Sequence, residues 1–192
     1  MNFDWQANWM TEEHLMFKES MRKFMEAEIA PNTDLWAEQG IVDREFWLKA
    51  GSAGLLGASA PTEFGGAGVD QSFDALTIYE QARVGDAGWG FGVHNICMHY
   101  ILGYGNDEQR SRWLPGLIAG EIIPAIAMTE PGTGSDLQAV KTTATADGDD
   151  YVLNGSKSFI TNGQQADIVI VVAKTDKQAG ASGVSLIVLE AS

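Results

Sequence analysis

The residue types and spacing best suited to holding a ligand lie between Ala127 and Asp136, in the stretch AMTEPGTGSD. A strand-like run leads into a turn that contains Gly132 and Gly134. Glycines let backbone N–H groups approach a ligand oxygen closely, and Thr129 and Ser135 add hydroxyl donors. Such a turn suits a phosphate group or the edge of a flavin ring. An ordinary polar hairpin turn explains the same residues, and composition alone favours that explanation.

A second stretch, Asn154 to Gly163, reads NGSKSFITNG. Its two Asn-Gly pairs are strong signals for tight turns, because both positions tolerate a positive φ. Between the turns lie Phe159, Ile160 and Thr161, and an aromatic ring beside a hydroxyl can flank a planar cofactor. An ordinary hairpin with one core phenylalanine is the simpler local explanation.

The remaining chemically active side chains form no convincing cluster. His94 and His99 do not share a helix face well, and no third ligand is spaced for a metal site, so we expect core or surface histidines. Carboxylates beside turns, such as Glu130 and Asp136, are expected to be solvated. Cys97 is the only cysteine, which excludes an intrachain disulfide and favours a small buried side chain.

The elements that position these stretches change character near residue 120. Before it, apolar residues recur at helical spacing; after it, they fall in short β-branched runs separated by turns. Thr11, Asp43 and Asn106 are suitable helix N-caps, Pro31 is expected to stop the first helix, and Pro115 to bend or end the last.

The later half is expected to be a β domain. Strands are predicted over residues 122–129, 140–146, 151–153, 158–160, 168–173 and 184–189. The fold class is therefore α+β, with an all-α helical domain over residues 1–120 followed by an antiparallel β-barrel or sandwich domain over residues 121–192. Because the last strand has nothing after it to cover its edge, the β domain is expected to be incomplete.

Charge and composition exclude several classes of function. The net charge is −14, from 26 acidic and 12 basic residues, so a nucleic acid would be repelled. The first residues lack the pattern of a secretory signal, and no apolar run reaches the length of a membrane span. These features predict a soluble protein of a reducing compartment such as the cytoplasm.

Taken together, these segments resemble the acyl-CoA dehydrogenase family, and in particular its long-chain branch. The two stretches described above carry most of the resemblance, because they occur in the family's order and at its usual separation. Further matching segments are Gly54–Gly57, Pro61–Gly68, Tyr79–Gln81, Asn106–Gln109, Leu114-Pro115 and Ala119–Glu121.

The resemblance implies an FAD site in the β domain. Backbone groups of the segment from Ile126 to Gly134 and the Thr129 hydroxyl would face the pyrimidine side of the flavin, and Ser135 would lie near the pyrophosphate and the acyl-CoA. Phe159, Ile160 and Thr161 would cover the ring's other surface, with Thr161 near the reactive nitrogen. The implied cofactor-binding residues are Ile126, Ala127, Met128, Thr129, Gly134, Ser135, Phe159, Ile160 and Thr161, with Ser135 also binding substrate.

Two residues depart from the family pattern. Ile126 stands where the family often has an aromatic residue, and Phe159 stands where tryptophan is common. Phenylalanine still stacks, so cofactor binding is expected to survive. The helix from Phe91 is expected to wall the acyl pocket, where Gly88, Gly90 and Gly92 would leave room for a long or branched chain or would simply loosen the helix start.

The implied reaction is α,β-dehydrogenation of an acyl-CoA thioester, in which a glutamate removes the α-proton and the β-hydride passes to the flavin. In the family this glutamate belongs to a C-terminal helical bundle, which is absent from this sequence. No catalytic residue is therefore assigned, and the chain alone is expected to be inactive. The resemblance also implies an electron-transfer flavoprotein as partner and a homo-oligomer as the complete protein.

Other functions stay open at this point. The chain is alternatively a half-subunit that needs a helical partner, or it belongs to an acyl-CoA oxidase or flavin monooxygenase on the same scaffold. A non-catalytic interaction protein that reuses the fold is the remaining alternative, and it would bind no flavin.

Overall fold

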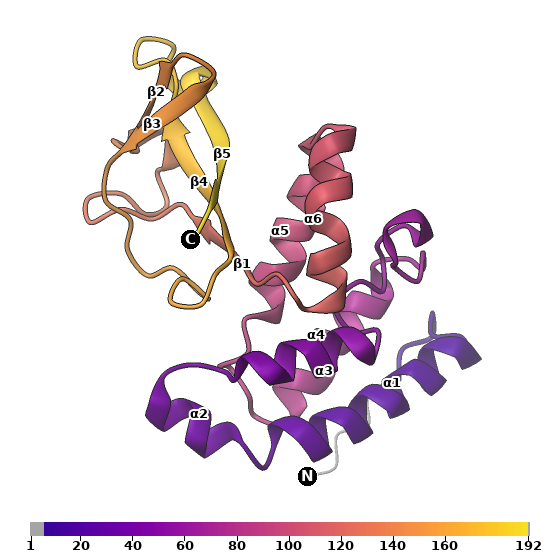
Figure 1. The fold of residues 1–192 in the computed structure, drawn as a ribbon. Helices are drawn as coiled ribbons and strands as arrows, with labels where there is room; N and C mark the ends of the chain where they lie inside the picture. Colours follow the sequence, from indigo (N-terminus) through magenta and orange to yellow (C-terminus); the bar gives the residue numbers. More distant parts are fainter. Residues whose placement is uncertain (1–5, 192) are drawn as a thin grey trace.

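The computed structural model describes residues 6–191, with helices in the first part of the chain and a five-stranded sheet in the second (Figure 1). The helices are α1 (Glu12–Phe24), α2 (Thr33–Gln39), α3 (Arg44–Ser52), α4 (Ser72–Arg83), α5 (Phe91–Tyr104) and α6 (Asp107–Ala119). The strands are β1 (Pro124–Ala127), β2 (Thr143–Asp147), β3 (Asp150–Asn154), β4 (Ile168–Lys174) and β5 (Val184–Glu190). This order confirms the predicted α+β architecture, and within residues 6–191 no helix follows β5.

The helix boundaries largely follow the local sequence. Thr11 is the N-cap of α1, as predicted, and α1 runs on through one π-helical turn, Met25–Ile29, before Pro31. Asn106 caps α6 by accepting a hydrogen bond from the backbone N–H of Gln109 at 2.8 Å.

Pro115 does not end α6, which continues to Ala119. A proline inside a helix removes one backbone hydrogen bond, but Leu114 and Leu117 on either side of it are fully buried. The packing of these leucines maintains the helix, because tertiary contacts contribute more to helix stability than propensity does.

The sheet is mixed. β1 pairs with β4 in parallel, β2 meets β4 through a single parallel pair, and β2–β3 and β4–β5 are antiparallel. The expectation of an antiparallel domain is therefore wrong for β1 and β4. The β2–β3 hairpin and the segment after it separate these two strands in the chain, and so long a connection permits parallel pairing.

The predicted strand over residues 158–160 is also wrong. The chain from Gly155 to Ile160 is irregular, and Phe159 has a φ of 59°, in the left-handed region that no strand uses. The hydrogen bonds of this segment go to the turn after β1 rather than to a neighbouring strand, as described below.

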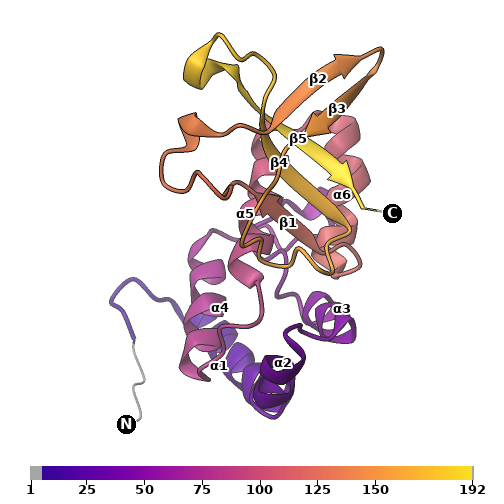
Figure 2. The same ribbon diagram turned by 90° about the vertical axis from the view of Figure 1, so that its left-hand side faces the viewer.

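Helices α5 and α6 pack against one face of the sheet, which Figure 2 shows by turning the molecule through 90°. Cys97, Met98 and Leu114 of the helices share one buried cluster with Ile168 and Ile170 of β4. This shared core places the end of β1, where the candidate site begins, directly beside α5.

Candidate functional site

The two stretches that the sequence singles out lie side by side. The chain leaves β1 at Ala127 and turns through Thr129, while the irregular segment after β3 runs back along it. The backbone N–H of Ser158 donates to the carbonyl oxygen of Thr129 at 2.9 Å. The structure thus brings together residues about thirty positions apart in the chain, and it places residues 126–135 next to residues 157–161.

A buried ion pair holds these two segments together. Lys157 Nζ lies 2.9 Å from Glu130 Oε1 and donates to the carbonyl oxygen of Met128 at 3.0 Å. Glu130 also accepts hydrogen bonds from the backbone N–H groups of Lys141 and Thr142, at 2.7 and 2.9 Å. Sequence reasoning expected a solvated carboxylate at Glu130, and this is wrong, because Glu130 is only 7% exposed.

The electrostatics of Glu130 follow from these contacts. Burial by itself raises the pKa of the carboxyl group, but interactions with Thr142, Lys141 and Lys157 favour the charged form more strongly. Together they lower the pKa of Glu130 to about 2. Glu130 is therefore ionised at neutral pH, and its contacts with Lys157 and the two backbone N–H groups clamp the turn after β1 in place.

The turn itself exposes polar groups. Glu130 and Thr133 exchange two backbone hydrogen bonds, at 2.9 and 3.1 Å, which close a tight loop. Gly134 and Ser135 are exposed beyond it, and Thr129 is half-buried. Among the residues implied by the resemblance, Ala127 is buried in the sheet, so only its backbone can face a ligand.

Phe159 is the most unusual residue of the second segment. Its side chain is 95% exposed, and its backbone adopts a left-handed conformation that disfavours non-glycine residues. No ring contact of Phe159 exists within residues 6–191. The sequence-based alternative of a hairpin with a core phenylalanine is therefore wrong.

Asn162 anchors the loop that follows, a role that the sequence signal of a tight turn did not reveal. Its Nδ2 donates to the carbonyl oxygen of Pro124 at 3.1 Å and to that of Gly90 at 3.4 Å. A Cβ on Gly90 would lie 2.2 Å from Asn162 Oδ1, so only glycine at residue 90 permits this approach. The loop is thus tied both to β1 and to the start of α5.

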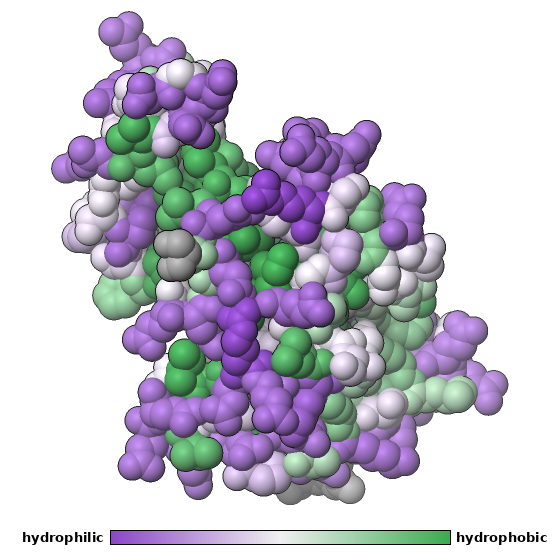
Figure 3. Space-filling model, viewed as in Figure 1, coloured by the Kyte–Doolittle hydropathy of each residue, from purple (hydrophilic) through white to green (hydrophobic). Residues whose placement is uncertain are grey.

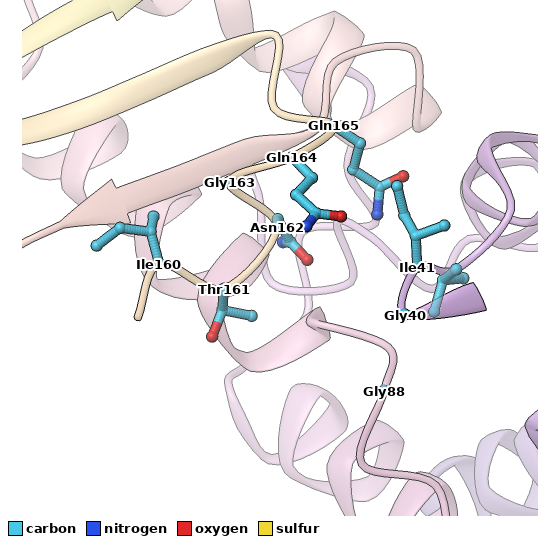
Figure 4. A pocket seen from close by; sticks show the side chains of 10 residues that line it. Gly40, Ile41, Gly88, Ile160, Thr161, Asn162, Gly163, Gln164 and Gln165 are labelled. Atoms are coloured by element: carbon cyan, nitrogen blue, oxygen red, sulfur yellow. The ribbon is translucent and has the colours of Figure 1, made fainter. Parts of the chain in front are cut away.

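A pocket of about 280 Å³ adjoins this loop. Figure 4 shows Ile160 to Gln165 along one side, with Gly40 and Ile41 facing them and Gly88 below. At Gly92 nothing lies within 4 Å of the position that a Cβ would take. The expectation of open space is wrong at Gly90, because Asn162 fills it.

A larger, mostly apolar cavity of about 680 Å³ lies between α4 and α5 and reaches Met128. Ile78 and Ile96 contribute exposed apolar side chains to its walls. At its polar end Asp74 is buried, and Ser59 Oγ bridges the Asp74 carboxylate and His99 Nε2, the latter at 3.2 Å.

His94 and His99 lie in different environments and form no shared site. His94 is fully buried beside Trp47, with ring centroids 5.6 Å apart, and neither ring nitrogen has a hydrogen-bond partner within residues 6–191. Burial lowers the pKa of His94 to about 3. His99 is half-buried on the other side of α5. They are a core and a surface histidine, as the sequence indicated.

Residues 6–191 contain neither a metal-binding cluster nor a helix suited to a membrane. No group of three or more histidine, cysteine, aspartate or glutamate side chains is placed to hold a metal ion. None of the described helices has the length and apolar character needed to cross a membrane.

Comparisons of the sequence with known families cover nearly the whole chain. A family model for the N-terminal domain of acyl-CoA dehydrogenase matches residues 11–121, and the model for the middle domain matches residues 125–192. The mitochondrial long-chain specific acyl-CoA dehydrogenase of Sus scrofa is 49% identical over 181 residues, which cover 93% of this chain and 42% of the relative.

Solved structures that resemble this chain include acyl-CoA dehydrogenases as well. An acyl-CoA dehydrogenase from Geobacillus kaustophilus has a TM-score of 0.92 and 45% identity, covering 96% of this chain and 50% of that one. A glutaryl-CoA dehydrogenase from Mycobacterium smegmatis, solved in complex with FADH2, has a TM-score of 0.85 and 31% identity, covering 94% and 46%. The present chain thus spans half or less of the length of these proteins.

Proposed function

The chain belongs to the acyl-CoA dehydrogenase family, and from this premise we propose that it holds part of the FAD and acyl-CoA site of an enzyme for α,β-dehydrogenation of acyl-CoA thioesters. In this proposal residues 1–120 form the helical domain and residues 121–192 belong to the domain that cradles the cofactor. The enzyme acts on fatty or branched acyl chains.

The observation that carries the proposal is the exposed ring of Phe159 beside the turn after β1. An aromatic side chain that is 95% exposed and held at a φ of 59° gains nothing from the protein core. Stacking on a planar ring would bury it and offset the backbone strain. Phe159, Ile160 and Thr161 therefore fit one surface of a flavin.

The polar groups nearby fit its edge. We assign the Thr129 hydroxyl and the backbone from Ile126 to Gly134 to hydrogen bonds with the flavin ring, and the Thr161 hydroxyl to its opposite side. Ser135, which is exposed at the end of the turn, is assigned to the pyrophosphate of the cofactor and to the acyl-CoA. The Glu130–Lys157 pair positions both sets of donors without touching the ligand.

The residues of this chain bind and orient the reactants. FAD, when bound, supplies the acceptor for the β-hydride of the substrate. The apolar cavity lined by Ile78, Ile96 and Met128 is assigned to the acyl chain, because its volume of about 680 Å³ suits an extended hydrocarbon and its walls are mostly apolar. Hydrogen bonds to the thioester oxygen would stabilise the developing enolate.

We assign no glutamate of this chain as the base that removes the α-proton. The proposal therefore expects the purified chain to hold FAD without turning over acyl-CoA, and it expects an electron-transfer flavoprotein to accept electrons from the complete enzyme. Turnover of an acyl-CoA by this chain alone, with an artificial electron acceptor, would show that the base lies within it.

The test is the visible absorbance of the chain after loading with FAD and desalting, followed by titration of FAD binding in two variants. Wild type should retain the flavin band. Phe159→Ala should weaken FAD binding about threefold to tenfold, the equivalent of about 0.5–1.5 kcal/mol of aromatic contact. The matched control is Tyr151→Ala, which removes another exposed aromatic ring, from β3. A wild-type chain that retains no flavin band, or equal affinities of the two variants for FAD, would contradict the proposed FAD site.

A further inference from the structure

The chain contains two Asn-Gly pairs, Asn154-Gly155 and Asn162-Gly163, and they lie in different environments. Asparagine before glycine is prone to deamidation, because glycine has no Cβ to hinder attack by its backbone nitrogen. In this reaction the glycine nitrogen bonds to Cγ of the asparagine, the bond from Cγ to Nδ2 breaks, and ammonia leaves with the proton of the backbone N–H. Water then opens the succinimide ring at either carbonyl carbon, which yields aspartate or isoaspartate.

The pair Asn162-Gly163 has both of its reacting groups engaged in hydrogen bonds. Asn162 Nδ2 donates to the carbonyl oxygens of Pro124 and Gly90, at 3.1 and 3.4 Å. The backbone N–H of Gly163 donates to the carbonyl oxygen of Ile160 at 3.0 Å. These bonds must be broken before the amide and the backbone nitrogen can meet, so the structure protects Asn162.

The pair Asn154-Gly155 has both of its reacting groups free. Asn154 is the last residue of β3, and both residues of the pair are exposed. Within residues 6–191 neither the side-chain amide of Asn154 nor the backbone N–H of Gly155 has a hydrogen-bond partner. Strand β3 pairs only with β2 and lies at the edge of the sheet (Figure 1), so the end of this strand opens at little cost.

The surroundings of Asn154 also favour the reaction. A cavity of about 530 Å³, which Asn154 and Gly155 line, gives the side chain room to turn back onto the backbone. Lys141 and Lys177 line the same cavity, and their positive charges favour the anion that develops as the backbone nitrogen attacks. Packing keeps glycine at residue 155, because a Cβ there would lie 2.2 Å from Thr142 Oγ1.

We propose that Asn154 is a site of spontaneous deamidation in the native chain, whereas the hydrogen bonds of Asn162 and Gly163 protect the second pair. The only co-reactant is water. The reaction needs neither FAD nor an acyl-CoA, so it stands apart from the proposed function.

Isoaspartate at residue 154 would act on the buried ion pair of Glu130. It adds one carbon to the backbone three residues before Lys157, whose Nζ lies 2.9 Å from Glu130 Oε1. A changed backbone path moves this ammonium group away from its carboxylate, and breaking a buried pair is destabilising. The isoaspartyl chain is therefore expected to be less stable than the unmodified chain.

Trypsin separates the two pairs, because cleavage after Lys141, Lys157 and Lys174 releases residues 142–157 and 158–174 as two peptides. Asn154 holds the only side-chain amide of the first peptide, so a mass gain from exchange of NH2 for OH identifies it. In the second peptide, fragment spectra distinguish Asn162 from its neighbouring glutamines.

The test is incubation of the native chain for several days at mildly alkaline pH, with samples taken for mass spectrometry of these peptides. Asn154 should deamidate at least about tenfold faster than Asn162, because hydrogen bonds hold both reacting groups of the second pair. The same incubation in concentrated urea keeps the two Asn-Gly sequences but removes the structure, and there the two rates should become similar. A native chain with no mass gain at Asn154, or with the same ratio of rates as in urea, would overturn the proposal.

Urea unfolding before and after the incubation tests the effect on the ion pair. Asn154→Gln is the matched control, because glutamine keeps an amide at this exposed position but must form a larger ring, which closes much more slowly. Only wild type should lose stability during the incubation. Equal losses in both chains, or unchanged stability of a deamidated wild type, would overturn the effect on Glu130 and Lys157.

Discussion

The environment of Glu130 in the structure is the opposite of the one that its sequence context predicts. Beside a Pro-Gly turn a carboxylate is normally solvated, yet here it is buried between Lys157 and two backbone donors. A buried pair of this kind contributes little net stability compared with an apolar pair, but breaking it leaves an uncompensated charge. We therefore interpret it as a clamp that fixes the geometry of the turn.

The Glu130 clamp makes a prediction about pH. Because the pKa of Glu130 is lowered from 4.5 to about 2 on folding, its contribution to stability is present above about pH 4.5 and is lost as the pH falls towards 2. Glu130→Gln should cost about 3–5 kcal/mol of unfolding free energy at pH 7, since it leaves Lys157 charged and unpaired. The difference between wild type and variant should shrink between pH 4.5 and 2.

Urea unfolding followed by circular dichroism at several pH values measures this difference. Glu63→Gln serves as the control, because Glu63 is exposed and has no ion pair within residues 6–191. If the gap between wild type and Glu130→Gln stays constant down to pH 3, the pKa of Glu130 is not lowered and the clamp is not ionic.

At the scale of elements, α3 and α6 approach so closely that glycine is required where they touch. A Cβ on Gly51 of α3 would lie 2.1 Å from the backbone oxygen of Ala119. Gly120, which ends α6 in a left-handed conformation, would in turn place a Cβ 2.1 Å from the backbone oxygen of Trp47. Trp47, whose backbone oxygen Gly120 approaches, is itself fully buried.

Gly51→Ala should therefore destabilise the chain by about 1–3 kcal/mol or more, because backbone rather than a flexible side chain obstructs the new methyl group. Gly103→Ala in α5 is the matched control: the site is exposed, with nothing within 4 Å of the new Cβ, and alanine is the better helix former. That control should be stabilised by up to about 1 kcal/mol. Thermal denaturation of both variants measures whether each is less or more stable than wild type. If Gly51→Ala leaves the stability unchanged, α3 and α6 can move apart.

At the scale of the whole molecule, the helices and the sheet are joined by a shared core rather than by a linker alone. The cluster around Cys97 and Met98 includes Ile168 and Ile170 of β4. Apolar surface nevertheless continues outward from this junction. Figure 3 shows it in green over β4 and β5 and again over α5, and the exposed side chains include Leu186, Leu189 and Ile96.

Cys97 lies at this junction and is the only cysteine in the chain, so its labelling rate can report whether the helices separate from the sheet. Burial raises the pKa of its thiol to about 12, so it should react negligibly with a disulfide reagent at pH 8 in the native state. Its labelling should become fast only at the urea concentration at which helical circular dichroism is lost. Ser111→Cys, at an exposed position of α6, should label at once in native buffer and provides the control. Rapid native labelling of Cys97 would mean that the helices and the sheet separate readily.

Much of this architecture could be predicted from the sequence, since its determinants are local. The caps at Thr11 and Asn106, the β-branched run of β4 and the Asn-Gly turn at Asn162 act within a few residues of themselves. The residue set of the candidate site was likewise predicted, although through a family resemblance that spans the chain rather than through any one motif. Its assignment to FAD stays a prediction.

The sequence alone thus determined that helices come first and strands follow, and it determined the net negative charge, because these follow from local propensity and composition. Only the tertiary structure decided that β1 and β4 run parallel, that Glu130 is buried against Lys157, and that Phe159 is left exposed at a positive φ. Each of these depends on which distant segment lies alongside, and a chain pattern with a period of two or 3.6 residues carries no information about partners thirty or more residues away. The free energy that selects them comes from burial and pairing in the folded molecule.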